Sequence, residues 1–269
     1  MEQPNCAICG STVDNEFIKT KRIRLVKCPD CSLAYLSPRP TDAEMAQVYD
    51  RDFFFDEYKA LYGLSYTEDK DNISKVASRR LQIIASLRNG EKGELLDVGC
   101  ATGFFLDVAR DQGWQVAGVD VSTFAVDYAK DSLGLDRVFQ GELQDIGFEN
   151  NQFNVATMWF VLEHSRNPVA LLTEVHRILK PGGMLALAVP NIGGLYFSLF
   201  KKRWLKERDL QYFHFYDFSP ASLQKALQRT GFLVQKMSSE GKLTKSRFAG
   251  PIVARHNKGN VLIVYAKKL

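Results

Sequence analysis

The sequence lacks a stretch that is typical of a signal peptide or of a membrane-spanning helix. The first residues, Met1–Cys6, contain no apolar run of the kind that a signal peptide needs. Gly182–Phe200 contains no charged residue, but Pro190, Asn191 and four glycines would interrupt a helix that crosses a bilayer. We expect this stretch to form a short buried strand, a turn and then a helix, and we expect the protein to be cytoplasmic.

Two common nucleotide-binding motifs are also missing. The dinucleotide pattern G-x-G-x-x-G is not met, because a match that starts at Gly99 would place Ala101 and Phe104 where glycines are required. The phosphate-binding loop G-x-x-x-x-G-K-[ST] does not occur either. These absences argue against NAD, FAD and P-loop nucleotides as ligands.

The composition shows no extreme bias. Hydrophobic residues make up 45% of the 269 residues and charged residues 25%, which is ordinary for a globular protein. A chain of this length holds about one or two domains and can bury a substantial core. The composition therefore argues against a wholly disordered, collagen-like or coiled-coil chain.

Positive charge is concentrated in three segments. The formal net charge is only +4, yet residues 19–27, 201–208 and 242–258 together carry +14, and the rest of the chain carries −10. Basic segments on an acidic body attract phosphate-bearing partners, whereas the simpler interpretation is three solvated loops.

Four of the five cysteines form one pattern. Cys6 and Cys9 make one C-x-x-C pair, Cys28 and Cys31 make a second, and 18 residues separate the two pairs. Two such turns supply four sulfur ligands for a tetrahedral zinc ion, and a set made only of cysteines suits a structural site. A redox C-x-x-C pair is the alternative, but the βαβ context of the thioredoxin type is missing here. Cys100 lies in a different motif and is not counted as a ligand.

A connector follows the cysteine-rich segment. Thr41 and Glu44 fit a capping box that opens a helix, and Ile73–Leu87 carries apolar residues at helical spacing. Between them lies an aromatic run, which we interpret as core packing or, alternatively, as a lid over a flat apolar ligand. Its members are Tyr49, Phe53, Phe54, Phe55, Tyr58, Tyr62 and Tyr66.

From residue 94 onward, strand and helix signals alternate. Strands are expected at 94–98, 115–119, 136–139, 153–158, 184–189, 232–236 and 261–266, and helices at 103–112, 122–132, 168–179 and 219–230. Such alternation predicts an α/β fold with a doubly wound, mostly parallel sheet. Asn167 and Pro168 favour a helix start, and Lys180–Gly183 favours a helix stop.

The turn after the first of these strands, Asp97–Gly103, is rich in glycine. A turn of this kind brings backbone N–H groups close to a ligand at the N-terminus of the next helix. Asp120 ends the second strand, 23 residues after Asp97, where a carboxylate can accept hydrogen bonds from both hydroxyls of a ribose. The alternative role for Asp120 is to cap the helix that follows it.

These motifs resemble those of class I S-adenosylmethionine (SAM)-dependent methyltransferases. The matching segments occur in order over residues 94–190: Asp97–Gly103, Gly118–Ser122, Phe160–His164 and Leu179–Gly183. The flanks resemble one bacterial branch that carries an N-terminal zinc ribbon and many of whose members modify sugars, glycans or secondary metabolites. The flanking motifs are the two C-x-x-C pairs, Leu36–Pro40, His214–Pro220 and Thr230–Phe232.

The resemblance implies an enzyme with a Rossmann-like, seven-stranded sheet, SAM as cofactor and structural zinc. It implies a zinc ribbon at 1–40, a helical, aromatic-rich connector or lid at 41–90 and a methyltransferase domain at 91–269. Elements of the acceptor pocket are expected at about 191–218.

The resemblance also assigns residues to the cofactor. Asp97 and the turn after it should bind the methionine part, Asp120 the ribose, and Val121 should lie beside the adenine. A second group should meet the adenine from the turn after the third strand, and a third group should pass under the methionine part. The full set is Asp97, Gly99, Cys100, Ala101, Thr102, Gly103, Asp120, Val121, Glu142, Leu143, Met158, Trp159 and Phe160. The family often has glycine at position 101 and aspartate at position 154, where this chain has Ala101 and Asn154.

Methyl transfer is an in-line displacement in which the cofactor supplies the electrophile. The protein must hold the acceptor about 3 Å from the methyl group, and a hydroxyl or carbon acceptor also needs a base, for which histidine is suited. His164, after the fourth strand, and His214, among aromatic residues, are the candidates for a base or an acceptor-positioning residue. His176 is expected to be structural, and His256 to lie in a polar loop.

The expected acceptor is a small molecule, a sugar or a glycan, such as a nucleotide sugar. The apolar and then basic segment Leu195–Arg208 offers a mouth for an anionic or lipid-linked acceptor at a membrane surface, or else a core-facing helix with a solvated end. An RNA methyltransferase and a non-catalytic SAM-binding protein that docks through its ribbon are the competing hypotheses. Residues 16–27 are basic but poor in aromatic residues, which disfavours nucleic acid.

Overall fold

The computed structural model describes residues 1–13, 15–41, 44, 58–59, 63–210, 213–241 and 256–269. Most of the helix expected after Thr41 lies outside these residues. Five aromatic residues of the expected connector also lie outside them, namely Tyr49, Phe53, Phe54, Phe55 and Tyr62.

The chain divides into two compact units. The first unit contains Met1–Asp42, Phe160–His176 and Leu187–Leu269, and the second contains Ala43–Trp159 and Arg177–Ala186. Each unit is described by itself below. The boundaries at residues 40 and 90 remain a prediction.

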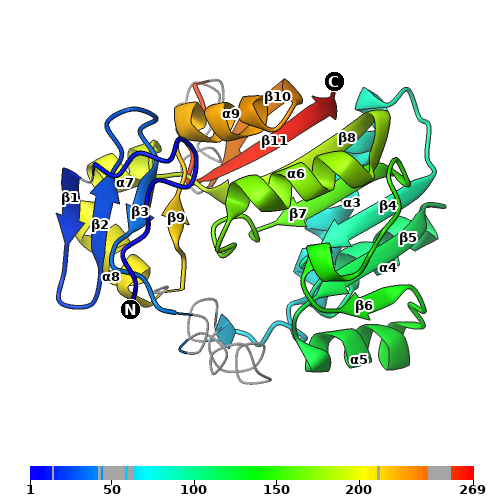
Figure 1. Cartoon of the computed structure of the whole chain (residues 1–269). Coiled ribbons are helices and arrows are strands. Elements are labelled where there is room, and N and C mark those ends of the chain that lie inside the picture. Colours follow the sequence, from blue (N-terminus) through cyan, green and yellow to red (C-terminus); the bar gives the residue numbers. More distant parts are fainter. Residues whose placement is uncertain (14, 42–43, 45–57, 60–62, 211–212, 242–255) are drawn as a thin grey trace. The chain divides into compact units, whose positions relative to one another are not determined.

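A seven-stranded sheet forms the centre of the fold, as predicted (Figure 1). Its strand order is β10-β11-β8-β7-β4-β5-β6. β4 pairs in parallel with β5 and β7, β5 pairs in parallel with β6, and β10 pairs antiparallel with β11. The strands are β4 (Glu94–Val98), β5 (Gln115–Asp120), β6 (Val138–Gln140), β7 (Phe153–Trp159), β8 (Leu179–Pro190), β10 (Phe232–Glu240) and β11 (Val261–Lys268).

In the second unit, apolar spacing explains which helix faces are buried. Helix α3 (Lys70–Leu87) buries Ala77, Leu81 and Ile84, which recur at helical spacing. The other helices are α4 (Phe104–Asp111), α5 (Thr123–Leu133) and the short 3₁₀ helix η2 (Leu143–Asp145). The interior strand β4 carries Leu95 and Leu96, both fully buried, as expected of a parallel strand covered on both faces.

In the first unit, the cysteine-rich segment forms a small antiparallel sheet with the order β1-β2-β3-β9. The basic residues 16–27 form a hairpin of two strands, β1 (Asn15–Lys19) and β2 (Arg24–Lys27). Backbone hydrogen bonding between Thr20 and Ile23 closes the turn between them. The third strand, β3 (Ala34–Leu36), pairs with β9 (Tyr216–Asp217), so a segment from the distant C-terminal part completes this sheet.

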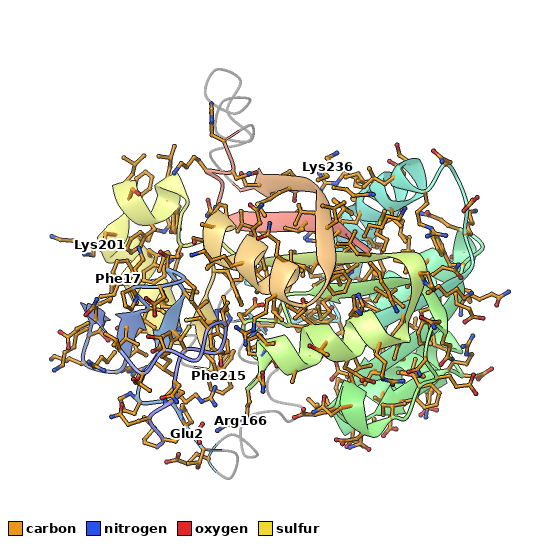
Figure 2. All side chains as sticks on the ribbon, turned by 45° about the horizontal axis from the view of Figure 1, so that its top comes forward. Glu2, Phe17, Arg166, Lys201, Phe215 and Lys236 are labelled. Carbon is orange, nitrogen blue, oxygen red and sulfur yellow. The ribbon has the colours of Figure 1, made fainter. Side chains whose placement is uncertain are left out.

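An ionic and aromatic cluster also joins distant parts of the first unit (Figure 2). The Arg39 and Arg166 guanidiniums lie 2.6 Å and 2.7 Å from the same Glu2 carboxylate oxygen. Both guanidiniums also lie over the Phe215 ring, at 5.5 Å and 5.4 Å from its centroid. Residues that are far apart in the sequence therefore contact one another through Arg39 and Arg166.

Helix starts follow the expected capping chemistry. The Ala170 amide donates to Asn167 Oδ1 at 3.0 Å before helix α6 (Pro168–Ile178), and Ser219 forms a capping box with Ser222 at the start of α9 (Pro220–Arg229). Helix α6 ends at Ile178, as the helix-stop signal at Lys180–Gly183 predicts, but β8 begins at Leu179, five residues before the strand expected at 184–189.

The uncharged stretch ends as expected, in a turn and then helix α7 (Leu195–Leu199), followed by α8 (Lys201–Leu210). α7 buries none of its residues, and Leu199 and Phe200 are 63% and 47% exposed, so this apolar run is not a core-facing helix. Within the residues that the structure describes, no helix is both long and apolar enough to cross a membrane.

Candidate active site

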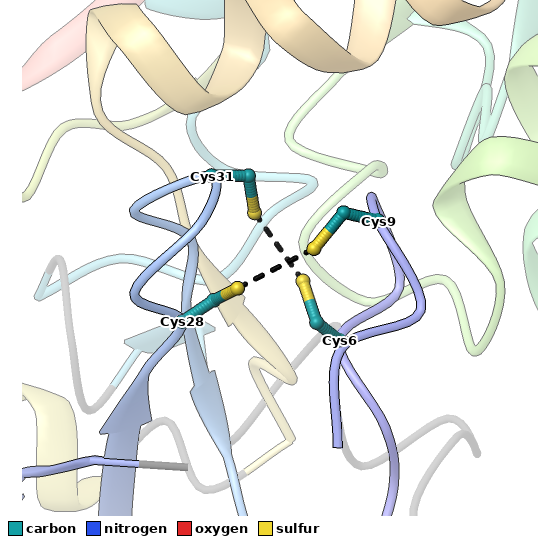
Figure 3. Close-up of side chains that lie close together, drawn as sticks. All are labelled: Cys6, Cys9, Cys28 and Cys31. Atoms are coloured by element: carbon teal, nitrogen blue, oxygen red, sulfur yellow. Dashed lines mark hydrogen bonds between the residues drawn. The ribbon is translucent and has the colours of Figure 1, made fainter. Parts of the chain in front are cut away.

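The four cysteines of the two C-x-x-C pairs meet in the first unit (Figure 3). Cys6 Sγ lies 3.3 Å from Cys31 Sγ, and Cys9 Sγ lies 3.4 Å from Cys28 Sγ. All four sulfur atoms lie within 4.8 Å of one another, the spacing that ligands of one ion need. The fifth cysteine, Cys100, lies in the second unit and is not part of this cluster.

The glycine-rich turn of the second unit is built from unusual backbone conformations. Gly99, Ala101 and Gly103 have φ values of 68°, 48° and 83°, which are all left-handed. The Gly99 and Cys100 amides both donate to the Val119 carbonyl, at 2.7 Å and 3.1 Å, and so tie the turn to β5. A Cβ on Gly103 would lie 2.7 Å from a methyl carbon of Leu135, so the start of α4 has no room for a side chain there.

Asp97 lies at the base of this turn and is 2% exposed. The Thr157 hydroxyl donates to its carboxylate at 2.5 Å. Burial raises the pKa of Asp97 to about 8, although the Thr157 hydrogen bond and the Arg80 charge oppose the shift. The carboxyl group is therefore a buried, weakly acidic group at the place where the cofactor was expected.

Asp120 ends β5, and its two oxygens accept backbone hydrogen bonds from different segments. The Ala101 amide donates to Oδ2 at 2.8 Å, and the Ser122 amide donates to Oδ1 at 2.9 Å. The alternative that Asp120 caps the next helix is wrong, because Ser122 is the N-cap of α5 and accepts from Ala125. Asp120 instead fixes the glycine-rich turn against β5.

The residues expected near the adenine differ in exposure. Val121 is 48% exposed, whereas Leu143 is 2% exposed in η2 and belongs to the core. Glu142 precedes η2, and its carboxylate accepts from the Gln144 amide. The structure thus leaves Val121 accessible to a ligand and Leu143 largely covered by protein.

The end of β7 carries Met158 and Trp159. Met158 is fully buried, whereas Trp159 is half-buried, packs against Phe105 at 5.3 Å between ring centroids and lies under the Arg80 guanidinium at 4.1 Å. The Trp159 indole Nε1 is buried and has no partner among the described residues. Phe160, the next residue and part of the first unit, is 41% exposed and has a φ of 61°.

Two residues near the turn were not singled out from the sequence. Arg80 comes from α3, and no spacing rule connects it with Trp159. Tyr66 stacks on Phe104, the first residue of α4, with ring centroids 5.9 Å apart and an angle of 8° between planes. Its membership in the aromatic run was the available signal, and its contact with the buried Phe104 fits the core-packing interpretation of that run as well as the lid.

His164 and His214 come together in the first unit. Their ring centroids lie 4.5 Å apart, with the planes at 89°. Burial lowers the pKa of His164 to about 4, although its hydrogen bond with the Phe213 backbone opposes the shift. Burial also lowers the pKa of His214, with a further contribution from His164. Both rings are therefore neutral near pH 7.

The other two histidines lie elsewhere. His176 packs in α6 against Phe232, with ring centroids 5.3 Å apart, and a Cβ on Gly231 would lie 2.8 Å from its Nε2 atom. His256 is exposed. Asn154 has a structural role, because its Oδ1 accepts from the Glu94 amide and from Lys180 Nζ, both at 3.0 Å.

Buried charges surround the histidine pair. Glu163 is fully buried, and burial raises its pKa to about 8. Arg208 forms a buried ion pair with Asp217 at 3.1 Å and donates to the His214 carbonyl. In the sequence, Glu163 stood out only as part of the segment Phe160–His164. The Arg208–Asp217 ion pair was missed because its two members come from different elements, α8 and β9.

Comparisons with known proteins agree with this geometry. The model of the methyltransferase domain family matches residues 69–236. Demethylmenaquinone methyltransferase from Staphylococcus aureus is 27% identical over 205 residues, which cover 68% of this chain and 81% of the relative.

Two solved structures share the fold. A SAM-dependent methyltransferase from Thermotoga maritima superposes with a TM-score of 0.55 at 21% identity, covering 72% of this chain and 89% of the other. A methyltransferase from Bacillus halodurans has a TM-score of 0.55 at 20% identity, covering 71% and 98%. Because the family model spans more than half of the chain, this protein belongs to the methyltransferase domain family and is a SAM-dependent methyltransferase.

Proposed function

We propose that this enzyme transfers the methyl group of SAM to a small-molecule acceptor of the sugar, glycan or quinone type. The observation that carries the proposal is the pair of neutral imidazoles of the half-buried His164 and the buried His214, which can accept a proton or orient a hydroxyl group. The similarity to a demethylmenaquinone methyltransferase supports a small molecule as the acceptor.

The second unit offers residues that fit the cofactor. Thr102 Oγ1 and Trp159 Nε1 are buried without a partner among the described residues, so both remain available to a polar ligand. The left-handed turn Gly99–Gly103 presents backbone in place of bulky side chains. Within the second unit we assign the methionine part to Asp97, Gly99–Gly103, Met158 and Trp159, the ribose to Asp120, and the adenine to Val121, Glu142 and Leu143. Bound SAM supplies an activated methyl group.

The role of the protein in the reaction is to orient the acceptor and to receive its proton. An acceptor oxygen or carbon attacks in line with the departing sulfur, and its proton passes to an imidazole nitrogen of His164 or His214. Desolvation keeps both imidazoles unprotonated near pH 7, which is the form that can accept a proton.

We also infer that zinc binds the four cysteines of the first unit. The sulfur spacing fits one tetrahedral ion. Although burial opposes it, hydrogen bonds from the Cys31 and Asp30 amides and from Cys9 lower the pKa of Cys28 to about 7. Burial raises the pKa of Cys6 to about 11 and also raises that of Cys31, so the charge of the bound ion would have to stabilise those two thiolates. A closed set of four thiolates would make this zinc structural.

The function is tested with isotopically labelled SAM and a panel of acceptors that contains nucleotide sugars, hydroxylated quinones and total RNA. We expect label in a small-molecule product. Changing His164→Gln or His214→Gln should lower turnover by at least about 100-fold, the range for a lost acid–base group, with SAM affinity nearly unchanged. His256→Gln, at an exposed histidine, is the control. Label in RNA alone, or SAM binding with no labelled product, would contradict the proposal.

A further inference from the structure

Glu163 carries a carboxyl group that is buried in the first unit. Its side chain is fully buried, and neither carboxylate oxygen has a hydrogen-bond partner among the described residues. An unpaired buried carboxylate is costly, and proteins usually resolve the cost with a hydrogen bond, a cation or a metal ion. The nearby cation, Arg208, already forms an ion pair with Asp217. A second cation bound by Glu163 would remove the cost of burying its carboxylate without a partner.

The imidazole rings of His164 and His214 lie close to the Glu163 carboxylate. His214 is 6% exposed, and its Nδ1 atom is buried without a partner among the residues that the structure describes. His164 hydrogen-bonds the Phe213 backbone, and one of its ring nitrogens lies within 4.8 Å of ligand atoms of Glu163 and His214. A hydrogen bond from a ring N–H to a backbone carbonyl is the usual support for a histidine that binds a metal.

The three side chains converge from two segments that are held together by backbone. Glu163 and His164 follow β7, and the Phe215 amide donates to the Glu163 carbonyl at 2.8 Å, which fixes His214 beside them. One ligand atom from each side chain lies within 4.8 Å of the others. Atoms that bind one ion at about 2.0–2.2 Å lie within about 4.4 Å of one another, so small side-chain rotations bring all three to a common ion.

We propose that Glu163, His164 and His214 bind one divalent transition-metal ion. Two imidazole nitrogens and one carboxylate oxygen suit Zn²⁺, Mn²⁺, Fe²⁺ or Co²⁺, whereas Mg²⁺ and Ca²⁺ prefer sites made only of oxygen. Three protein ligands leave coordination positions open, as in catalytic rather than structural metal sites. The site is distinct from the four-cysteine cluster in both residues and ligand type.

The open positions suggest what the ion does, and this step rests on the proposed function. An acceptor hydroxyl bound to the ion would lose its proton at a lower pH, because the metal charge stabilises the alkoxide or phenolate. With the ion bound, His164 and His214 would serve as its ligands instead of receiving the proton directly, and the acceptor proton would leave to solvent. The acceptor would be a molecule that offers an oxygen atom beside the methylated position. Metal binding itself does not depend on this role.

The test is direct metal binding, without SAM or acceptor, to protein adjusted to one zinc per chain, so that zinc fills only the four-cysteine cluster; we call this the zinc-loaded protein. Titration with Mn²⁺, followed by loss of the electron paramagnetic resonance signal of the free ion, should show one bound Mn²⁺ per chain. Glu163→Gln and His214→Gln should each weaken binding by more than about 100-fold, beyond the cost of losing a residue that only supports a ligand. His256→Gln should leave it unchanged. Circular dichroism and the thermal midpoint check that each variant is folded.

A second probe separates the two metal sites. Co²⁺ added to the zinc-loaded protein should give visible d–d absorption without the thiolate-to-metal charge-transfer band that four cysteines would produce. Binding of neither Mn²⁺ nor Co²⁺, or binding that folded Glu163→Gln and His214→Gln proteins retain, would overturn the proposal. Because no methyl transfer is measured, a failure of the metal site and a failure of the proposed function give different results.

Discussion

Asp97 shows how one buried carboxyl group shapes the cofactor site. Its folded pKa of about 8 is raised by burial above the ordinary value of an aspartate. The folded protein therefore keeps a proton on Asp97 at pH values where the unfolded chain has released it. Linkage then requires that the free energy of unfolding falls as pH rises from about 5 towards 8.

The Asp97→Asn variant tests this linkage. In the absence of SAM, the wild-type free energy of unfolding should fall more steeply between pH 5 and pH 7 than that of Asp97→Asn. The difference in slope should approach about 1.4 kcal/mol per pH unit, the value for one proton. Urea denaturation at several pH values measures both slopes. Parallel slopes would show that Asp97 titrates alike in the folded and unfolded states.

Gly103 lets us separate backbone strain from crowding. Gly103 and Gly134 both have left-handed φ values, but only Gly103 faces close neighbours, the Leu135 methyl at 2.7 Å and Ala129 Cβ at 3.1 Å. Gly134→Ala should cost about 1–2 kcal/mol of stability from strain alone. Gly103→Ala should cost about 1–3 kcal/mol more and should weaken SAM binding, because Leu135 is buried and cannot move freely. Equal losses in thermal denaturation would contradict the crowding argument.

At the residue scale, local patterns were predictable and long-range partners were not. The four cysteines were found because each C-x-x-C pair is a local pattern with one main chemical use. His164 and His214 were found separately, but their contact with each other and with Glu163 was not, because no pattern states which loops meet. Arg80, on the face of Trp159, was missed for the same reason.

At the scale of elements, β4, β5, β7 and the four helices expected after residue 94 were predicted to within one residue at each end, whereas β8 begins five residues earlier than expected. Alternating apolar runs and glycine turns specify such units locally. The hairpin between β1 and β2 was missed because Thr20–Ile23 contains neither glycine nor proline to mark the turn. The pairing of β3 with β9 was missed because Asp217 lies 183 positions after its partner Ala34, farther than any local signal reaches.

Helices α7 and α8 carry the feature most relevant to the acceptor. Leu199 and Phe200 are exposed, and the exposed Lys201 and Lys202 follow at once, whereas Arg203 forms an ion pair with Glu207 at 3.1 Å. The exposed side chains of Leu199 and Phe200 beside the exposed ammonium groups of Lys201 and Lys202 suit an amphipathic, anionic acceptor. The segment is thus a candidate for acceptor recognition rather than for core packing.

The double variant Lys201→Gln/Lys202→Gln tests this segment. For an anionic acceptor we expect KM to rise by about 10-fold, with kcat nearly unchanged, since two screened surface charges act mainly on binding. The wild-type KM should rise with salt, and the variant should show a weaker salt dependence. Lys236→Gln on β10, an exposed lysine in another part of the first unit, is the control (Figure 2). Equal KM values in all three proteins would remove the segment from acceptor binding.

At the scale of the whole molecule, the residues proposed for the cofactor and those proposed for metal binding and proton transfer lie in different units. The glycine-rich turn, Asp97 and Asp120 all lie in the second unit, whereas the four cysteines and the histidine pair lie in the first. Within the first unit, β3 extends the cysteine-rich segment and pairs with β9, which directly follows His214 and Phe215. Loss of the zinc site should therefore disturb the histidine pair and spare the cofactor site.

Zinc loss can be tested with Cys9→Ser, which changes the one half-buried cysteine of the cluster and keeps the volume similar. Metal analysis should show one zinc fewer per chain, and the thermal midpoint should fall, because a structural zinc contributes directly to folding free energy. SAM affinity, measured by calorimetry, should stay within about threefold, about 0.7 kcal/mol, while methyl transfer and Mn²⁺ binding at Glu163, His164 and His214 fall together. Cys100→Ala, outside the cluster, should keep the full zinc content. If Cys9→Ser instead lost SAM affinity and kept Mn²⁺ binding, the division of work between the two units would be wrong.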